Sequence, residues 1–494
     1  MLGGVRALWV PFALAGCDWA YSLDRPPEQP TTVEVTYRRI ALSNLADMPV
    51  RVPVAYPELA VRVELADGTV LEPIPDAEGK LSFQRFGEEP YRIRFTAPGE
   101  IPNEYLLATP TLDVGIKRTV RPDAVEPADT TRLVVDIPDA DIVSDTATLL
   151  HATGVWAQRS SPGPSANRKF DLEWKREGGF LGLPGLLDAS KGDRLFCSQH
   201  EVEASPTYVA LSEVGEVANP TMADGETTTV TCTLQPVPRD KCLRLAVGHA
   251  AENVRLKAVS TSFVDTQTLT VVLAAPDPVH SPAGHWLANQ YVSAMGDAGA
   301  LDFRGDVQFA QPFPNHRVVV EARTSRTRAL SLPGTGKDLA FGLSMSRFFV
   351  VDPEDGPCTQ TADTSAQIAI PSSPDIAGTG LVADETPVTI DREKRVPITW
   401  SLGPGGTTDR FVVRLFEVQI VNMIPIFVGV QQWVTTSTDR SIDIDPDVLV
   451  AGKRYSITVE TNLGIPGAAE GNMVDFVYPL AIAGYPSPTF IVAN

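Results

Sequence analysis

The chain has 494 residues, a length that predicts about three or four domains. Its 42 prolines favour many short strands joined by turns, because proline fits neither the interior of a helix nor a central strand. The 61 acidic and 41 basic residues give a formal net charge of −20, which repels phosphate backbones and excludes nucleic acid as an expected partner.

The first 16 residues have the layout of a secretory signal. Arg6 supplies a positive start, residues 7–13 are apolar, and small residues lead up to Cys17. The apolar run is too short to span a bilayer. We therefore predict a signal peptide over residues 1–16 and a linker over residues 17–30. The alternative is a buried N-terminal strand or helix with an incidental cysteine.

The sequence Leu14-Ala15-Gly16-Cys17 resembles the lipobox of bacterial lipoproteins. The resemblance implies cleavage before Cys17, acylation of its thiol and, in most members, acylation of its new amino group. Two or three acyl chains hold a protein stably on a membrane, whereas one binds only marginally. The protein is therefore expected in the bacterial cell envelope, anchored by lipid, with the outer membrane or cell surface favoured over the inner membrane.

Residues 31–129 are predicted to form the first β domain. Residues 32–37 alternate polar and apolar side chains, and residues 60–95 place further alternating strands after turns at Asp67-Gly68 and at residues 76–79. Together with Phe83 and Tyr91, this pattern resembles the carboxypeptidase-regulatory or transthyretin-like sandwich. That resemblance implies a structural or carbohydrate-adjacent module without catalytic residues of its own.

Two further β domains are expected over residues 130–237 and 238–365. Alternating strands recur at residues 131–136, 228–234, 243–247, 269–273 and 318–322, and one short helix is expected at residues 180–187. No segment with helical periodicity is long enough for a wound α/β sheet. These two domains resemble no family.

Four cysteines besides Cys17 suit an oxidising compartment, where two disulfides could form. If residues 235–240 join two domains, Cys197 pairs with Cys232 and Cys242 pairs with Cys358. If the same residues are a hairpin turn, Cys232 faces Cys242 across it. Zinc is a poor alternative, because the sequence contains no C-x-x-C pair and no adjacent histidine.

Residues 371–494 resemble a fibronectin type III domain. Trp400 occupies the position of the tryptophan that fills the centre between the two sheets, and Leu449, Gly452 and Tyr455 match the corner motif of the sixth strand. Ala451 and Lys453 replace the usual proline and threonine of that motif. The resemblance implies a spacer or binding module in which these four matching residues are structural anchors.

The sequence contains no complete catalytic motif among those considered. Residues 331–338 resemble a P-loop but have Ser331 and Asp338 where it needs a glycine and a hydroxyl. The histidines form no H-E-x-x-H motif, although His280 and His285 could frame a metal. The aspartates at positions 352, 355, 443, 445 and 447 lack calcium-loop spacing, and no G-x-S-x-G elbow is present.

The sequence thus predicts an all-β protein of tandem β-sandwich domains, immunoglobulin-like or fibronectin type III-like, after an N-terminal signal segment. We expect a non-catalytic envelope lipoprotein with a scaffold, adhesion or assembly role, no cofactor and no metal. Its expected partners are the lipid bilayer and envelope proteins or glycans. The alternative is an envelope hydrolase acting on glycan or peptide, with a carboxylate site in residues 130–365.

Overall fold

The structure is a computed structural model. It describes residues 30–41, 50–53, 59–76, 78–97, 101–117, 121, 123–141, 146–153, 157–160, 168–174, 185–204, 207–260, 263, 266–277, 281–295, 303–313, 318–331, 338–351, 354–355, 358, 361–363, 367–421, 424–436 and 438–493. Cys17 and the predicted signal peptide lie outside these residues. Strands dominate the described chain, arranged in several sheets and multiple domains, so the all-β prediction is confirmed.

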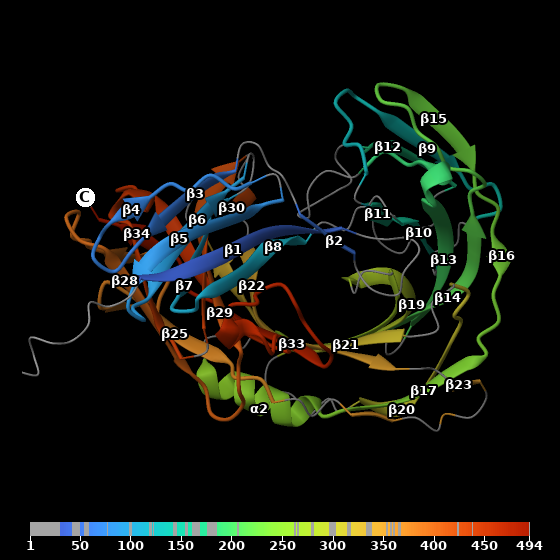
Figure 1. Ribbon diagram of the computed structural model, residues 1–494. Helices are drawn as coiled ribbons and strands as arrows, with labels where there is room; N and C mark the ends of the chain where they lie inside the picture. Colours follow the sequence, from blue (N-terminus) through green and yellow to red (C-terminus); the bar gives the residue numbers. More distant parts are fainter. Residues whose placement is uncertain are drawn as a thin grey trace, which may run out of the picture.

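Nineteen of the described strands belong to one long sheet (Figure 1). In order of hydrogen bonding it contains β11 (Ala157–Ser160), β10 (Thr146–Thr153), β13 (Arg194–Ala204), β14 (Thr207–Glu216), β19 (Ser281–Met295), β18 (Thr266–Asp277), β21 (Val318–Ser331), β22 (Asp338–Val351), β33 (Leu480–Pro486), β32 (Arg454–Leu463), β29 (Arg410–Val421), β30 (Ile424–Thr436), β7 (Asn103–Leu107), β6 (Tyr91–Thr96), β3 (Ala60–Glu64) and β4 (Val70–Leu71). Three short strands pair at its sides: β16 (Gln235–Pro236) on β14, β34 (Phe490–Val492) on β32, and β27 (Thr386–Val388) on β34.

Four smaller sheets each face one part of the long sheet. The first contains β1 (Pro30–Ala41), β2 (Val50–Pro53), β5 (Lys80–Phe86) and β8 (Thr111–Lys117). The second contains β9 (Arg132–Asp136), β12 (Lys169–Glu173) and β15 (Thr227–Thr231). The third contains β17 (Lys241–Val247), β20 (Phe303–Phe309), β23 (Glu354–Asp355) and β24 (Thr361–Asp363), and the fourth contains β25 (Pro371–Ile376), β26 (Thr379–Gly380), β28 (Val396–Leu402) and β31 (Ser441–Ile444).

Each small sheet and the part of the long sheet that it faces enclose one apolar core. Strand β5 shows the cause, because alternate side chains are buried and exposed along its whole length. In the first core, β1 and β5 pack against β3 and β6, and in the second, β9 and β12 pack against β10 and β13. In the third, β17 and β20 pack against β18 and β21, and in the fourth, β28 and β31 pack against β29 and β32. We call these sandwiches the first to fourth units.

The third and fourth units are joined by direct strand pairing. Residues Ser344 to Phe348 of β22 pair antiparallel with Leu480 to Gly484 of β33. Helix α2 (His249–Val259), the α-helix of the described residues, packs over this junction in an apolar cluster that contains Leu256, Leu343 and Ala481. This helix was not predicted from the sequence. It is neither long nor apolar enough to cross a membrane, and neither is any other described helix.

The first and fourth units lie side by side although they are far apart in sequence, as the blue and red strands of Figure 1 show. Strand β7 pairs parallel with β30 from Asn103↔Gln432 onwards. The core of the first unit also includes Val412 and Val434 of the fourth unit. The fourth unit therefore packs against the first, and β30 continues the sheet that contains β7.

A buried carboxylate connects these two units. Glu104 of β7 accepts from Arg94 at 2.6 Å and from Arg92 at 3.2 Å, and Gln431 of β30 donates to it at 3.1 Å. Arg94 also pairs with Asp445 of the fourth unit at 2.7 Å. Each of these charges thus has a partner, which is what burying a charge requires.

Acid should loosen this interface. Burial alone would raise the pKa of Asp445, but the hydrogen bond from Arg94 and the charges of Arg395 and Arg94 outweigh it and lower the pKa below its ordinary value of 3.8. A carboxyl group with a lowered folded pKa stabilises above its unfolded pKa, and loses that contribution as the pH falls through the folded value. We therefore expect the amides of β6 and β7 to lose hydrogen-exchange protection only below pH about 4.

Asp445→Asn provides the control for that measurement, with exchange corrected for its intrinsic pH dependence. The variant should have lower protection of β6 and β7 at neutral pH and a flatter response to acid. Equal acid profiles for the variant and the parent would show that Asp445 does not hold the units together.

The two disulfides lie within separate units. Cys197 pairs with Cys232 in the core of the second unit, and Cys242 of β17 pairs with Cys358. This is the first of the two pairings considered from the sequence, and Cys232 does not bond to Cys242. Residues 235–236 form β16 on β14 rather than the turn of a cysteine hairpin. Two disulfides in one chain indicate an oxidising, extracytoplasmic compartment.

The predicted helix at residues 180–187 lies mostly outside the described residues. Its described part, residues 185–187, has no regular secondary structure.

Candidate binding site at the open edge of β29

The predicted anchors of the fourth unit lie in its core and at one corner. Trp400 is buried in the core, tilted edge-on to Phe411 with ring centroids 5.1 Å apart. Tyr455 is buried at the start of β32, and its hydroxyl accepts a hydrogen bond of 2.9 Å from the backbone N–H of Val450. Burial raises the pKa of Tyr455, so its hydroxyl stays protonated.

The same corner turns the chain away from β29. Leu449 is buried, and Gly452 has a φ of 76°, a left-handed conformation that glycine adopts without strain. Strand β32 consequently begins only at Arg454, and its ladder with β29 ends at the pair Glu417↔Tyr455. Strand β29 continues to Val421, where it pairs only with β30 among the described strands.

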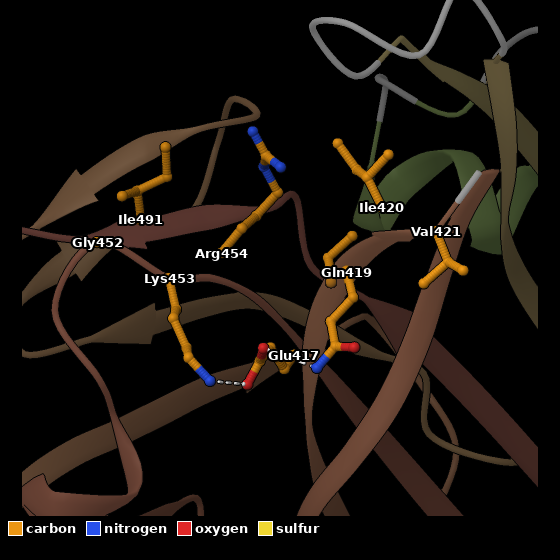
Figure 2. Close-up of a pocket in the computed structure, with 9 residues that line it drawn as sticks. Glu417, Gln419, Ile420, Val421, Gly452, Lys453, Arg454 and Ile491 are labelled. Atoms are coloured by element: carbon orange, nitrogen blue, oxygen red, sulfur yellow. Dashed lines mark hydrogen bonds and ion pairs between the residues drawn. The ribbon is translucent and has the colours of Figure 1, made fainter. Parts of the chain in front are cut away.

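A groove lies at this open edge. It has a volume of about 360 Å³ and is lined by Glu417, Val418, Gln419, Ile420, Val421, Gly452, Lys453, Arg454 and Ile491. Five consecutive residues of one strand line it, although successive side chains of a strand point to opposite faces. The edge of β29, with its backbone N–H and C=O groups, therefore faces the groove. Figure 2 shows β29 on one side of it and Lys453, Arg454 and Ile491 on the other.

Charged side chains lie at one end of the groove. Glu417 accepts from Lys453 at 2.8 Å and from Gln419 at 2.9 Å (Figure 2). The hydrogen bond from Lys453 is the main reason why the pKa of Glu417 is lowered, and that of Lys453 is raised in return. Arg454 pairs with Glu385, while its Nε atom is buried with no hydrogen-bond partner in the described chain. The lining thus carries two cations and one anion.

The other end of the groove is apolar. Ile420 and Val421 are 40% and 45% exposed, and Ile426, Phe427 and Val428 of β30 are also exposed. No charged residue occurs between positions 417 and 439. Exposed sheet edges are usually protected by charges, proline or a covering segment, and such an uncharged edge is a template for pairing with another chain.

The sequence signal for this edge was missed. The uncharged run at residues 418–438 indicates an unprotected hairpin, but no prediction was drawn from it. Lys453 was noted only as a departure from the corner motif. The hairpin itself is held against the third unit, because Phe427 lies edge-on to Phe341 of β22 with ring centroids 5.2 Å apart.

The aspartates and histidines considered as metal ligands are only partly described, because residue 352 lies outside the described residues and the side chain of Asp355 is not described. Asp443 and Asp445 are paired with Arg92 and Arg94, respectively. Residue 280 is outside the described residues, and the position of the His285 side chain is not described. Within the described ranges, no three histidine, cysteine, aspartate or glutamate side chains are grouped as metal ligands would be.

The P-loop-like segment lies between two strands. Ser331 ends β21 and Asp338 begins β22, with residues 332–337 outside the described chain. The two strands pair antiparallel from Ser331↔Asp338 onwards, so the segment connects a β-hairpin. A P-loop instead leads from a parallel strand into a helix.

One acidic group in residues 130–365 bears on the hydrolase alternative. Burial and the neighbouring charges of Asp141, Asp139 and Glu201 raise the pKa of Glu213 on β14. The amide of Gln199 holds the backbone of Asp141 through hydrogen bonds of 3.0 and 3.1 Å. A carboxyl group with a raised pKa beside other carboxylates is a feature of glycosidases, but structural clusters show it as well.

Comparison with known proteins assigns no family. No protein-family model matches the chain, and no curated protein matches it. Among solved structures, it is similar to Escherichia coli alpha-2-macroglobulin activated by porcine elastase, with 8% identity and a TM-score of 0.15 over 94% of this chain and 44% of that chain. A Salmonella alpha-2-macroglobulin mutant has 8% identity and a TM-score of 0.16 over 95% of this chain and 40% of that chain. The Bacillus anthracis TIE protein has 8% identity and a TM-score of 0.13 over 99% of this chain and 79% of that chain. The chain spans less than half the length of the two macroglobulins, and these similarities are weak.

Proposed function

We propose that the protein is a non-catalytic scaffold of the bacterial envelope, tethered to a membrane through acylated Cys17 and assembling other envelope components. The observation that supports this most is the long sheet that continues through all four units. Separate sandwiches on a flexible chain would move independently, whereas hydrogen-bonded strands and shared cores hold the units in a fixed arrangement. A fixed arrangement suits a protein that positions its partners.

The N-terminus supports the tether. Thirteen peptide units separate Cys17 from Pro30, where β1 begins, and such a segment can span at most about 45 Å. The disulfides place the chain in an oxidising compartment, which agrees with a lipoprotein signal. The scaffold would therefore work close to the membrane surface.

The tether is tested by Cys17→Ser, which removes the acylated sulfur. We expect the parent to float with membranes in a density gradient and the variant to remain in the soluble fraction, because loss of two or three acyl chains removes stable membrane binding. Ser22→Ala, outside the lipobox, is the matched control and should float like the parent. Flotation of Cys17→Ser with membranes would contradict the tether.

Cross-linking in intact cells tests the assembly role. A scaffold should give specific cross-links to envelope proteins or glycans in the parent, and these should fall sharply in Cys17→Ser. Unchanged cross-links in the untethered variant would argue against assembly at the membrane.

The hydrolase is the second candidate, and the raised pKa of Glu213 is the observation in its favour. Purified protein incubated with envelope glycan and peptide fragments should release no products if the scaffold proposal is right. Product release that is lost in Glu213→Gln would overturn the non-catalytic proposal.

A further inference from the structure

We propose that the open edge of β29 binds the C-terminal end of an extended, apolar peptide by strand addition. This inference names the class of partner and rests on the proposed scaffold function. The edge comprises Val418–Val421, beyond the last β32 pair at Glu417↔Tyr455. Addition of one strand there would satisfy backbone groups that β32 leaves unpaired when the corner turns the chain away.

The geometry gives the direction of the added strand. Strands β29 and β32 run antiparallel, and β32 begins at Arg454. A strand that continues the line of β32 along Val418–Val421 is then also antiparallel to β29, the more stable pairing. Such a strand runs from the hairpin end towards Arg454. Its C-terminus therefore lies next to Lys453 and Arg454.

The charges at that end suit an α-carboxylate. Lys453 has three N–H donors, of which Glu417 takes one, and its side chain is 45% exposed. The buried Nε of Arg454 has no partner in the described chain. Lys453 and Arg454 already pair with Glu417 and Glu385, so what an incoming carboxylate would use is the remaining N–H donors of Lys453 and the Nε–H of Arg454. A hydrogen bond between an ammonium or guanidinium group and a carboxylate is stronger than one between neutral groups, so a free C-terminus should bind better than an amide.

The apolar side chains limit what the rest of the peptide can be. Ile420 and Val421 on β29 and Ile491 on β34 line the groove. An added strand would place its alternate side chains against these residues. The occupant is therefore an extended segment of about four residues with apolar side chains at alternate positions and a free C-terminus.

The test uses full-length protein purified from a detergent lysate of whole cells, which yields the protein whether or not it is tethered. The probe is a pool of N-terminally fluorescein-labelled hexapeptides with Val, Ile, Phe or Tyr at alternate positions and Thr or Ser between them. One pool ends in a free carboxylate, and a matched pool ends in an amide. Fluorescence polarisation should show binding of the free acids, weakened about tenfold by amidation.

Two variants distinguish the contribution of strand pairing to peptide binding from that of the charged side chains. Lys453→Met should reduce the preference for the free acid to less than about threefold, while the amidated pool still binds. Ile420→Lys places a charge on the open edge and should abolish binding of both pools. Ile74→Lys is the control, because Ile74 is 90% exposed in the first unit and distant in sequence from the groove.

Three outcomes would overturn this site: no binding by either pool, equal binding of acid and amide, or parental binding by Ile420→Lys in a variant whose circular dichroism is unchanged. These outcomes leave the scaffold proposal untouched, because that proposal is judged by membrane flotation and cross-linking. If flotation and cross-linking fail but the peptides still bind, the scaffold proposal is overturned and the binding site at the edge of β29 stands.

Discussion

Gly471→Ala is expected to separate the first unit from the fourth. Gly471 has a φ of 91°, and a Cβ atom there would lie 1.9 Å from the backbone oxygen of Thr111 in the first unit. Backbone hydrogen bonds fix this contact, because Asp113 donates to Gly471 and Met473 donates to Asp113 at 2.9 and 2.8 Å. The left-handed strain and the forced displacement together should cost about 2–5 kcal/mol.

Hydrogen exchange of β7, β8 and β30 measures this separation. Protection of all three strands should fall, whereas protection of β9 in the second unit should not change. Gly452→Ala is the matched control: its φ is 76°, but a Cβ atom there meets nothing within 4 Å. This variant should lose only the stability that corresponds to the left-handed backbone strain, about 1–2 kcal/mol. Equal losses in both variants would mean that the contact at Thr111 does not hold the units together.

Glu252→Ala should detach helix α2 from the long sheet. The Glu252 carboxylate forms an ion pair with Arg347 of β22 and accepts a hydrogen bond of 2.6 Å from Thr324 of β21. Both members of the pair are at least 90% buried. Burial raises the pKa of Glu252, against the opposing effects of Arg347 and Thr324. Removal of one partner leaves a buried charge, which costs about 3–5 kcal/mol.

The amides of α2 report this loss, and their protection factors should fall by about two to three orders of magnitude. Replacing both partners, with Glu252→Leu and Arg347→Met, should restore most of the protection, since a buried ion pair and an apolar pair of similar volume are often equivalent. Asp306→Ala breaks the exposed pair with Arg244 in the same unit and should change little. Protection of α2 in the single variant equal to that of the parent would contradict the argument.

The local pattern of the sequence determined the strands and their turns. Alternation predicted the buried faces of β1 and β5, and Asp67-Gly68 lies in the turn between β3 and β4, where Gly68 has a φ of 83°. Such features depend on neighbouring residues, so they can be inferred from spacing alone. The carboxylates and arginines of the buried network gave no such signal, because a charged position in a strand normally indicates a solvated face.

Only the tertiary structure decided how the units combine and where the open edge lies. Pairing of β22 with β33 and of β7 with β30 joins residues more than 100 positions apart, which no local period encodes. The groove likewise exists because β29 is longer than its ladder with β32, a comparison of two strands that meet only after folding. The sequence by itself determined that the chain is all-β and which residues anchor the corner of the fourth unit, and it predicts the signal peptide. Edge exposure and the pairing of buried charges depend on which surfaces the folded chain covers.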